Sequence, residues 1–579
     1  MIKKYALKFF ARFFVSLGVF TFVVVALLVF VAVRNHHTVP NLPEKMVLTL
    51  SLRDGVAEQT GPKNMLAAFN QETPALNLSQ ITQSIYAAAN DTRVKGLVVV
   101  LEPSQIGLAQ VQELRAAVKQ FKQAKKFAII YAQNLSGAPS MANYWLATIF
   151  DQIWLAPLDE LPITGFGMAV PFGKNLLDKL GIKAQLLYHG TYKGAHETYT
   201  RSNISPAQNE ELVRLLGEFN DQFVADVAVS RHVNATKLIA LMRQAPLPVE
   251  QAVTSGLADT VAYPDEFEVY MDKLTHGVAP IDLETYAANL AYQNSNDKAA
   301  NIAVIYADGA ITDAPPAAGM AGSGVVSARL VAGALAQAAA NKHIKAIILR
   351  IDSPGGSPQA SETIHRAIIL AKKRKPVVVS MGNMAASGGY WIAAPASAIV
   401  AQPASITGSI GVFGGKVSLQ GLWQKLGVNW ASISAPVGDN SLFSPHQDYS
   451  PQARVKVQAS LDRVYEAFVA RVAKGRKLDL KTVDALAEGR VWTGAHAQKL
   501  GLVDALGGMD KALMVAKKLA KVAPQKPIKL VTLPEAPSAF EQFQQLLQQG
   551  LGGGLQGLPD LLSFLWQPGA TLRPILAVY

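Results

Sequence analysis

The strongest constraint in this sequence is an internal repeat that covers most of its length. Stretches from the first half reappear, with conservative changes and in the same order, in the second half. Such self-similarity indicates that one structural unit occurs twice. The matched pairs are "LSLRDGVAE" at 50–58 with "VIYADGAIT" at 304–312, "VKGLVVVL" at 94–101 with "IKAIILRI" at 344–351, "NYWLA" at 143 with "GYWIA" at 389, "FVADVAVSR" at 223 with "FVARVAKGR" at 468, and "SGLADTV" at 255 with "LGLVDAL" at 500.

Each copy alternates short β-rich runs with helical patterns. In the second copy "AIILRI" is followed by apolar residues on one helical face (Ile364, Ile368 and Ala371), then by "PVVVS" and another helix signal. This alternation favours α/β units around a largely parallel sheet. We therefore expect two tandem α/β domains at 45–290 and 300–525, joined by the polar segment "AYQNSNDKAAN" at 291–301.

The N-terminal end has the composition of a membrane anchor. Residues 13–33 are an uncharged apolar run of 21 residues, which is long enough to cross a bilayer as a helix. Basic residues precede it, namely Lys3, Lys4, Lys8 and Arg12. This excess of positive charge predicts that residues 1–12 are cytoplasmic and that both repeats lie outside. A cleavable signal peptide is the alternative, but its apolar core would be shorter and no small-residue cleavage site follows.

Composition excludes several kinds of chemistry. The chain has no cysteine, which rules out disulfides, thiolate catalysis and cysteine-ligated metals. No cluster has metal-ligand spacing, so we expect no metal and no cofactor. The net charge of +12 is spread along the chain without a basic stripe carrying aromatics, so we expect no nucleic-acid partner.

The C-terminal tail, residues 535–579, is rich in Gln, Leu and Gly. Gly552, Gly554 and Gly557 have the spacing of a dinucleotide-binding loop, but no strand precedes them. We interpret this match as chance. The tail has the pattern of an amphipathic helix that could rest on a membrane or on a neighbouring chain.

A candidate nucleophile lies in "VVVSMGNMAASGGYWIAAP" at 377–395. Ser387 follows a β-branched run and precedes Gly388 and a helix signal. Small residues are common where a strand turns tightly into a helix, so the turn alone is weak evidence. The repeat strengthens the case, because the first copy has Met141 at the matching position. The two copies have diverged where chemistry would need a serine.

A glycine loop in the second copy could stabilise an oxyanion. "RIDSPGGS" contains Gly355 and Gly356, whereas the first-copy counterpart "VLEPSQIG" lacks the pair. Backbone N–H groups of this loop and of Gly388 could receive a developing negative charge.

The base that would activate the serine is less obvious. Histidine is the usual partner, and the next histidine after Ser387 is His446, in a predicted loop. Lysine is the other candidate if burial lowers its pKa. The repeat sets Lys193 of "GTYKGA" opposite Asp439, just past a predicted strand. One copy therefore has a lysine and the other a serine.

Together these motifs resemble the signal peptide peptidase A family of membrane-anchored serine proteases, in its long tandem-repeat form (protease IV). The resemblance rests on the anchor, both copies, "DSPGGS", "MAASGGYW", "TGSIG" and "GTYKGA". It implies a crotonase/Clp-protease-like fold, with Ser387 as nucleophile and Lys193 as general base. Ser409 of "TGSIG" corresponds to the serine that orients the lysine, and it is also the rival nucleophile. Neither serine lies in a Gly-x-Ser-x-Gly elbow.

The resemblance also implies a setting and a substrate. We expect a homo-oligomer, with a tetramer as its size, at the periplasmic face of the bacterial inner membrane, degrading cleaved signal peptides and other apolar peptides. After the lysine motif, however, "HETYTRSN" departs from the family's usual continuation. The resemblance therefore does not specify the details of the substrate groove. We expect serine and lysine to come from one chain, because the short linker holds the copies at high effective concentration.

Two other functions compete with this endopeptidase. A crotonase-like acyl-CoA enzyme would share the fold class, but its chemistry belongs to the cytoplasm and the predicted anchor places the domains outside. A non-catalytic membrane scaffold would need neither Ser387 nor Lys193.

Overall fold

The computed structural model describes residues 42–53, 55–59, 75–135, 137, 140–293, 300–314, 324–435 and 438–534, together with Gly18. The predicted anchor at 13–33, the cytoplasmic segment at 1–12, most of the linker at 291–301 and the tail at 535–579 lie outside these residues. Within the described ranges, no helix combines the length and apolar character that crossing a bilayer requires.

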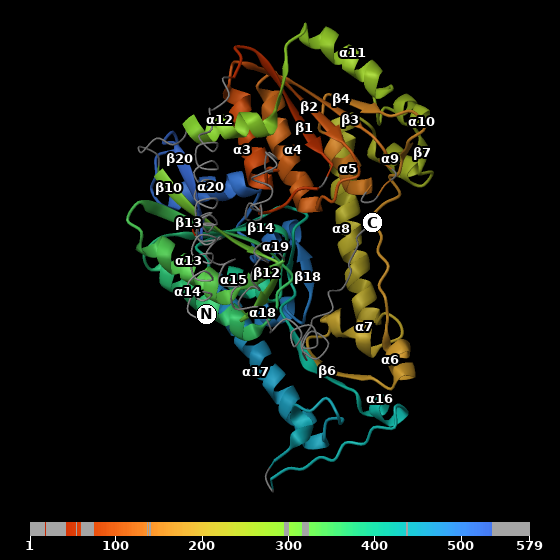
Figure 1. Cartoon of the computed structure of the whole chain (residues 1–579), viewed down its shortest axis with the longest axis vertical. Coiled ribbons are helices and arrows are strands. Elements are labelled where there is room, and N and C mark those ends of the chain that lie inside the picture. Colours follow the sequence, from red (N-terminus) through yellow and green to blue (C-terminus); the bar gives the residue numbers. More distant parts are fainter. Residues whose placement is uncertain are drawn as a thin grey trace, which may run out of the picture.

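The first copy is built around a six-stranded, all-parallel sheet with the order β8-β4-β3-β2-β1-β9. Helices cover both faces, as the alternating pattern predicts (Figure 1). Its elements are β1 (Met46–Leu52), α3 (Leu78–Asn90), β2 (Val94–Leu101), α4 (Leu108–Gln123), β3 (Phe127–Ala132), α5 (Ser140–Ala147), β4 (Gln152–Leu155), β5 (Glu160–Leu161), α6 (Lys174–Leu180), β6 (Lys183–His189), η1 (Gly194–His196), α7 (Glu197–Thr200), α8 (Pro206–Arg231), α9 (Ala235–Met242), β7 (Leu247–Pro248), α10 (Val249–Thr254), β8 (Thr260–Val261), α11 (Pro264–Thr275), β9 (Pro280–Asp282) and α12 (Leu283–Gln293).

The second copy repeats this plan around an eight-stranded sheet, whose main path is β18-β16-β14-β13-β10-β20 with β15 and β19 branching from β14. Only the β16–β18 pair of this sheet is antiparallel. Its elements are β10 (Ala300–Asp308), β11 (Ala310–Thr312), β12 (Val325–Ser327), α13 (Ala328–Ala340), β13 (Ile344–Ser353), α14 (Pro358–Lys372), β14 (Val377–Ala386), α15 (Gly388–Ala393), β15 (Ala398–Ala401), β16 (Ile406–Gly408), β17 (Val412–Ser418), α16 (Gln420–Lys425), η2 (Asn440–Leu442), α17 (Pro451–Arg476), α18 (Leu480–Leu486), β18 (Val491–Thr493), α19 (Gly494–Lys499), β19 (Ala505–Leu506), α20 (Met509–Leu519) and β20 (Ile528–Leu533).

The matched sequence pairs occupy equivalent elements in the two copies. The runs at 94–101 and 344–351 form the central strands β2 and β13, and the pair at 223 and 468 lies in the long helices α8 and α17. Two details differ from the expected plan. Strand β20 continues the second sheet past residue 525, and no strand forms at 427–435, although the matching first-copy segment is β6.

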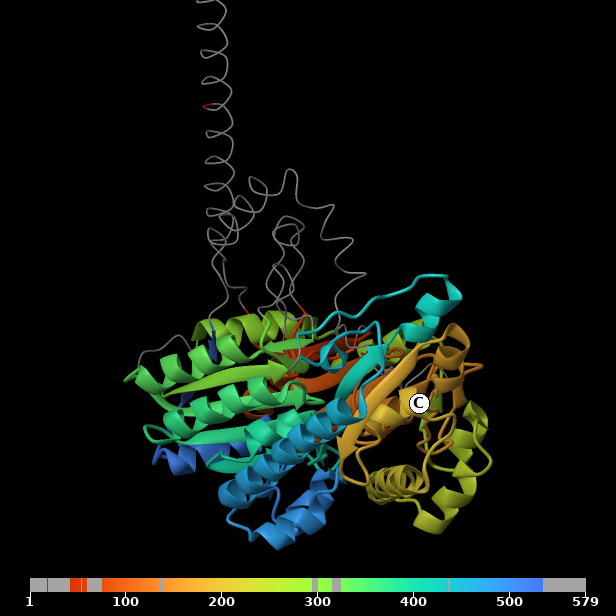
Figure 2. The ribbon, with the colours of Figure 1, turned by 90° about the horizontal axis from the view of Figure 1, so that it is seen from below.

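An antiparallel ribbon links the two copies. Strand β6 of the first copy pairs along its whole length with β17 of the second, from Lys183 opposite Ser418 to His189 opposite Val412. Figure 2 shows the two strands side by side across the molecule. Because β6 leads directly into the turn at 190–193, this ribbon carries first-copy residues to the edge of the second domain.

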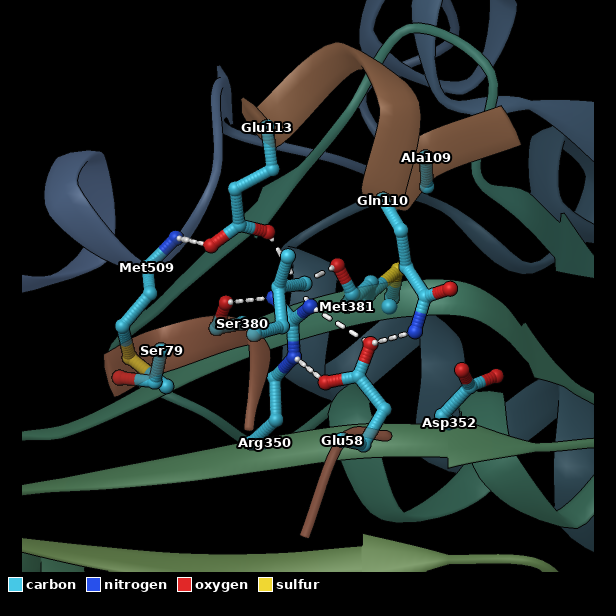
Figure 3. A network of polar contacts seen from close by, with 12 residues as sticks. Glu58, Ser79, Ala109, Gln110, Glu113, Arg350, Asp352, Ser380, Met381 and Met509 are labelled. Atoms are coloured by element: carbon cyan, nitrogen blue, oxygen red, sulfur yellow. Dashed lines mark hydrogen bonds and ion pairs between the residues drawn. The ribbon is translucent and has the colours of Figure 1, made fainter. Parts of the chain in front are cut away.

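A buried ionic cluster also joins the copies. Arg350 of β13 is 2% exposed and lies between Glu58 and Glu113 of the first copy, at 2.8 and 3.1 Å (Figure 3). Gln110 donates to Glu58, and the backbone N–H of Met509 donates to Glu113. A buried charge is tolerated only when it is paired and hydrogen-bonded. These contacts therefore join the two domains through a buried charge that is both paired and hydrogen-bonded.

Candidate active site

Ser387 lies at the sharp turn between β14 and α15. The strand is buried for most of its length, and the serine follows it with φ 55° and ψ −120°, outside the regions that L-residues favour. Its N–H donates to the Gly408 carbonyl at 2.9 Å, and its carbonyl accepts from Tyr390 and Trp391 of α15. The strained backbone is therefore held by hydrogen bonds on both sides, which is typical of a functional position.

The glycine loop after β13 packs directly against this turn. Gly355 has φ +103°, and a Cβ atom there would lie 2.6 Å from the N of Gly388 and 2.8 Å from the Cβ of Ser387. A Cβ on Gly388 would lie 3.0 Å from the N of Gly356. Only glycine permits this approach. The three predicted oxyanion residues are thus neighbours of Ser387.

The amides of these glycines are not equivalent. The N–H of Gly355 donates to Ser353 Oγ at 3.1 Å. Among the described residues, no protein acceptor is bonded to the N–H of Gly356 or of Gly388. Free N–H groups at a helix start favour negative charge. An oxyanion would thus be received by Gly356 and Gly388, with Gly355 shaping the loop.

Lys193 reaches the serine from the other copy. It lies in the turn after β6, is 5% exposed, and its Nζ is 2.9 Å from Ser387 Oγ. The same Nζ is 2.9 Å from both the carbonyl and the Oγ of Ser409. The ribbon of β6 and β17 therefore brings together the lysine and both serines that the sequence singled out.

Among the described residues, no carboxylate contacts the buried lysine amine. Burial lowers the pKa of Lys193 from 10.5 to about 7, so a large share of the amine is neutral near neutral pH. A neutral amine has two N–H donors and one lone pair. The carbonyl of Ser409 can only accept and its hydroxyl can also accept, which leaves the lone pair for the proton of Ser387.

Ser409 also has a left-handed backbone, with φ 52°, and its N–H donates to the Arg490 carbonyl at 2.6 Å. The glycine pair Gly355-Gly356 packs against Ser387 and Gly388. The two contacts of Ser409 to the amine fit an orienting role better than that of nucleophile.

The remaining positions from the sequence lie away from this centre or lack its chemistry. Met141, opposite Ser387 in the repeat, is buried in the first core near the start of α5. Asp439 caps η2, where Ser441 and Ser450 donate to its carboxylate and lower its pKa. His446 stacks on Trp430, with ring centroids 3.6 Å apart, and has no contact to Ser387.

Sequence reasoning missed a third contributor, the segment 488–491 that precedes and begins β18. The carbonyl of Glu488 accepts from Tyr192 N at 2.7 Å, and a Cβ on Gly489 would lie 2.4 Å from Lys193 N. The backbone carbonyl of Arg490 accepts from Ser409 N, and its guanidinium carbon lies 3.5 Å from the centroid of the Tyr192 ring. No motif marks this segment, because the residues it contacts lie far away in the chain.

His196 lies beside the lysine turn as well. Its Nδ1 is 2.8 Å from the Lys193 carbonyl, and its ring stacks on Tyr188 at 3.9 Å. It begins the stretch "HETYTRSN" that departs from the expected motif. That departure therefore lies against the backbone of Lys193 and leaves the contacts of its amine in place.

Comparison with known proteins identifies the family. The profile of peptidase family S49 matches twice, at residues 120–276 and 369–523, once in each copy. Together the matches cover more than half of the chain. The chain belongs to peptidase family S49. The Clp protease profile also matches residues 323–405, which include the glycine loop and Ser387, so the tandem domains are Clp-protease-like.

Several S49 relatives match over most of their length. Protease 4 of Salmonella typhi is 32% identical over 486 residues, covering 79% of this chain and 75% of the relative. Protease 4 of Haemophilus influenzae is 32% identical, covering 81% and 77%. The chloroplastic serine protease SPPA of Arabidopsis thaliana is 30% identical, covering 84% and 71%. This S49 member is accordingly a serine protease.

In the described ranges, no three His, Asp or Glu side chains gather in a way that could hold a metal ion. The expectation of a cofactor-free enzyme stays a prediction.

Proposed function

We propose that this S49 protease is a membrane-anchored endopeptidase in which Ser387 is the nucleophile and Lys193 the general base. The observation that carries the proposal is the 2.9 Å contact between Lys193 Nζ and Ser387 Oγ, made by an amine whose burial lowers its pKa to about 7. A hydroxyl needs such a base to attack near neutral pH.

In the proposed reaction, the Lys193 lone pair takes the hydroxyl proton of Ser387 while Oγ bonds to the scissile carbonyl carbon. The N–H groups of Gly356 and Gly388 stabilise the oxyanion. As the C–N bond breaks, the lysine ammonium gives its proton to the leaving amine. Water then attacks the acyl-enzyme with Lys193 again as base, and the proton returns to Ser387 Oγ.

Substitution of the two residues tests the assignment. Ser387→Ala and Lys193→Ala should each abolish peptide hydrolysis while leaving the oligomeric state unchanged. Lys193→Arg should also be inactive, because a guanidinium stays protonated. Ser409→Ala should retain partial activity, since it removes one of the two Ser409 contacts and leaves the carbonyl. Wild-type turnover in any of the first three variants would exclude the dyad.

We further propose that each site is built within one chain. Both side chains meet here without a second subunit, and the ribbon of β6 and β17 is continuous. Mixing Ser387→Ala subunits with Lys193→Ala subunits should leave every oligomer inactive, because each chain lacks half of its dyad. Recovery of activity would show that serine and lysine come from different chains.

The substrates we propose are cleaved signal peptides and other apolar peptides at the periplasmic face of the inner membrane. The predicted anchor at 13–33 supports this location, and one relative, from Enterococcus faecium, is named a putative signal peptide peptidase; it is 36% identical over 183 residues, covering 31% of this chain and 53% of the relative. The homo-oligomer, with a tetramer as its expected size, belongs to the same proposal. Hydrolysis of an apolar signal-peptide core should exceed that of a polar peptide of equal length. Preference for the polar peptide would contradict the substrate assignment.

A further inference from the structure

The turn that carries Lys193 is short. It consists of Gly190, Thr191 and Tyr192 after the end of β6, and within it Lys193 N donates to the Gly190 carbonyl at 3.1 Å. Thr191 is exposed. The position of the Lys193 amine therefore depends on the contacts that hold this turn, in addition to its own hydrogen bonds to Ser387 and Ser409.

Glu488 of the second copy holds it from two directions. Its Oε2 accepts from Thr191 N at 2.9 Å and from Thr191 Oγ1 at 3.1 Å, while its own carbonyl accepts from Tyr192 N at 2.7 Å. Three donors of the lysine turn thus end on one residue.

The backbone of Glu488 is itself constrained. Its φ is +53°, unusual for a residue with a side chain, and Gly489 follows with φ +80°. A Cβ on Gly190 would lie 2.7 Å from the Glu488 carbonyl carbon, so the two segments are in close backbone contact. Strained backbone of this kind persists where the surroundings fix it, commonly at functional sites.

The segment also contacts the other side of the lysine. Gly489 N donates to the Ile410 carbonyl at 2.9 Å, and the Arg490 carbonyl accepts from Ser409 N. Helix α17 supports it from behind, where the Tyr465 hydroxyl donates to Asp484 at 2.7 Å and lies 3.5 Å from Glu488 Oε1. Among the described residues, the charged and titratable groups around Glu488 include Tyr465, Asp484 and Arg490, with His189 stacked on Tyr465 and Lys193 in the turn itself.

We propose that Glu488 is a positioning residue that clamps the lysine turn of the first copy onto the serine-bearing domain of the second. The inference rests on the proposed role of Lys193 as base. Without these contacts the turn can move away from the second domain. Water then reaches the Lys193 amine, and the amine loses its alignment with Ser387 Oγ. Misplacement of a reacting group by about 1 Å costs on the order of 100-fold in rate.

Two substitutions separate position from charge. In Glu488→Ala the two side-chain contacts to Thr191 are lost and only the backbone contact to Tyr192 remains, so kcat should fall roughly 10- to 100-fold with little change in KM. The pH at which activity is half-maximal should rise by about one unit, because a wetter amine holds its proton longer. Glu488→Gln keeps an acceptor for Thr191 and should restore both kcat and the pH profile. If the carboxylate acted only by its charge, both variants would shift the profile downward.

Two further variants complete the test. Thr191→Val removes only the hydroxyl and should give a milder defect of the same kind, which keeps the test valid if Glu488→Ala folds poorly. Glu466→Ala removes an exposed acid beside Tyr465 on α17 and should behave as wild type. Wild-type kinetics in Glu488→Ala, or a Glu488→Gln enzyme as slow as Glu488→Ala, would overturn the proposal.

The outcome can be told apart from failure of the dyad itself. Ser387→Ala and Lys193→Ala are assayed alongside. If both are inactive while Glu488→Ala is normal, only the clamp is wrong; if both are active, the proposed base and nucleophile are wrong.

Discussion

His189, the last residue of β6, pairs with Val412, the first residue of β17, although the two belong to different copies of the repeat. Lys193 follows β6 and Ser409 precedes β17, and the two side chains meet near this end of the ribbon. The pairing explains how two incomplete copies make one site. The first copy supplies the amine and the second supplies both serines and the glycine loop.

The pH dependence of activity should follow the lysine. Since the folded pKa of Lys193 is lowered to about 7, kcat/KM should rise with pH through about 7 and level off above it. Enzyme held at each pH and then assayed at pH 8 controls for unfolding. A profile that falls between pH 6 and 8 would contradict a neutral lysine base.

The same lysine should cost stability at neutral pH. Its pKa is lower in the folded chain than in the unfolded one, so the unfolded state binds more protons between about 7 and 10.5. Lys193→Met should therefore be more stable than wild type, with an advantage that grows as pH falls from about 10 to 7 and then stays constant. Urea unfolding across this range measures it, with exposed Lys119→Met as control. An advantage independent of pH would argue against the lowered pKa.

Gly355→Ala should inactivate the enzyme without unfolding it. The added Cβ would lie 2.6 Å from Gly388 N and force the loop away from the serine turn, at a φ of +103° that alanine disfavours. We expect a loss of about 10²–10³ in kcat, the effect of a lost oxyanion donor. Gly333→Ala, with no atom within 4 Å of the new Cβ, is the matched control and should keep full activity.

The buried ionic cluster should dominate the stability of the domain interface. Arg350→Met would leave Glu58 and Glu113 buried and unpaired, which costs about 3–5 kcal/mol in unfolding free energy. Arg53→Met breaks an exposed pair with Glu102 and should cost about 0–1 kcal/mol. Denaturant unfolding compares the two variants. Equal losses of unfolding free energy would contradict a dominant role for the Arg350 cluster.

Chelators should leave hydrolysis unchanged, because the proposed mechanism needs only oxygen and nitrogen side chains. Treatment with EDTA followed by desalting checks this, with a zinc protease as the sensitive control. Loss of activity that added metal restores would mean that the proposed mechanism is incomplete.

Much of this architecture follows from local pattern. The β-branched runs of the repeat predicted the strands β2 and β13, because buried parallel strands are rich in such residues. Ser387 and Gly355 could be predicted because each lies in a short glycine-containing motif. Glu58 and Glu488 could not, because their partners Arg350 and Thr191 lie in the opposite copy and no local pattern records a contact between domains. The segment at 427–435 forms no strand although its repeat partner is β6, so the repeat alone does not predict this part of the second copy.

The most direct test of the central claim is to map where a fluorophosphonate bonds to the purified protein. The reagent reacts only with a serine oxygen that a base has activated. Peptide mass mapping should find one adduct per chain, on Ser387, and Lys193→Ala should abolish it while Glu466→Ala leaves it intact. An adduct on Ser409, or labelling of Ser387 that persists without Lys193, would contradict the account.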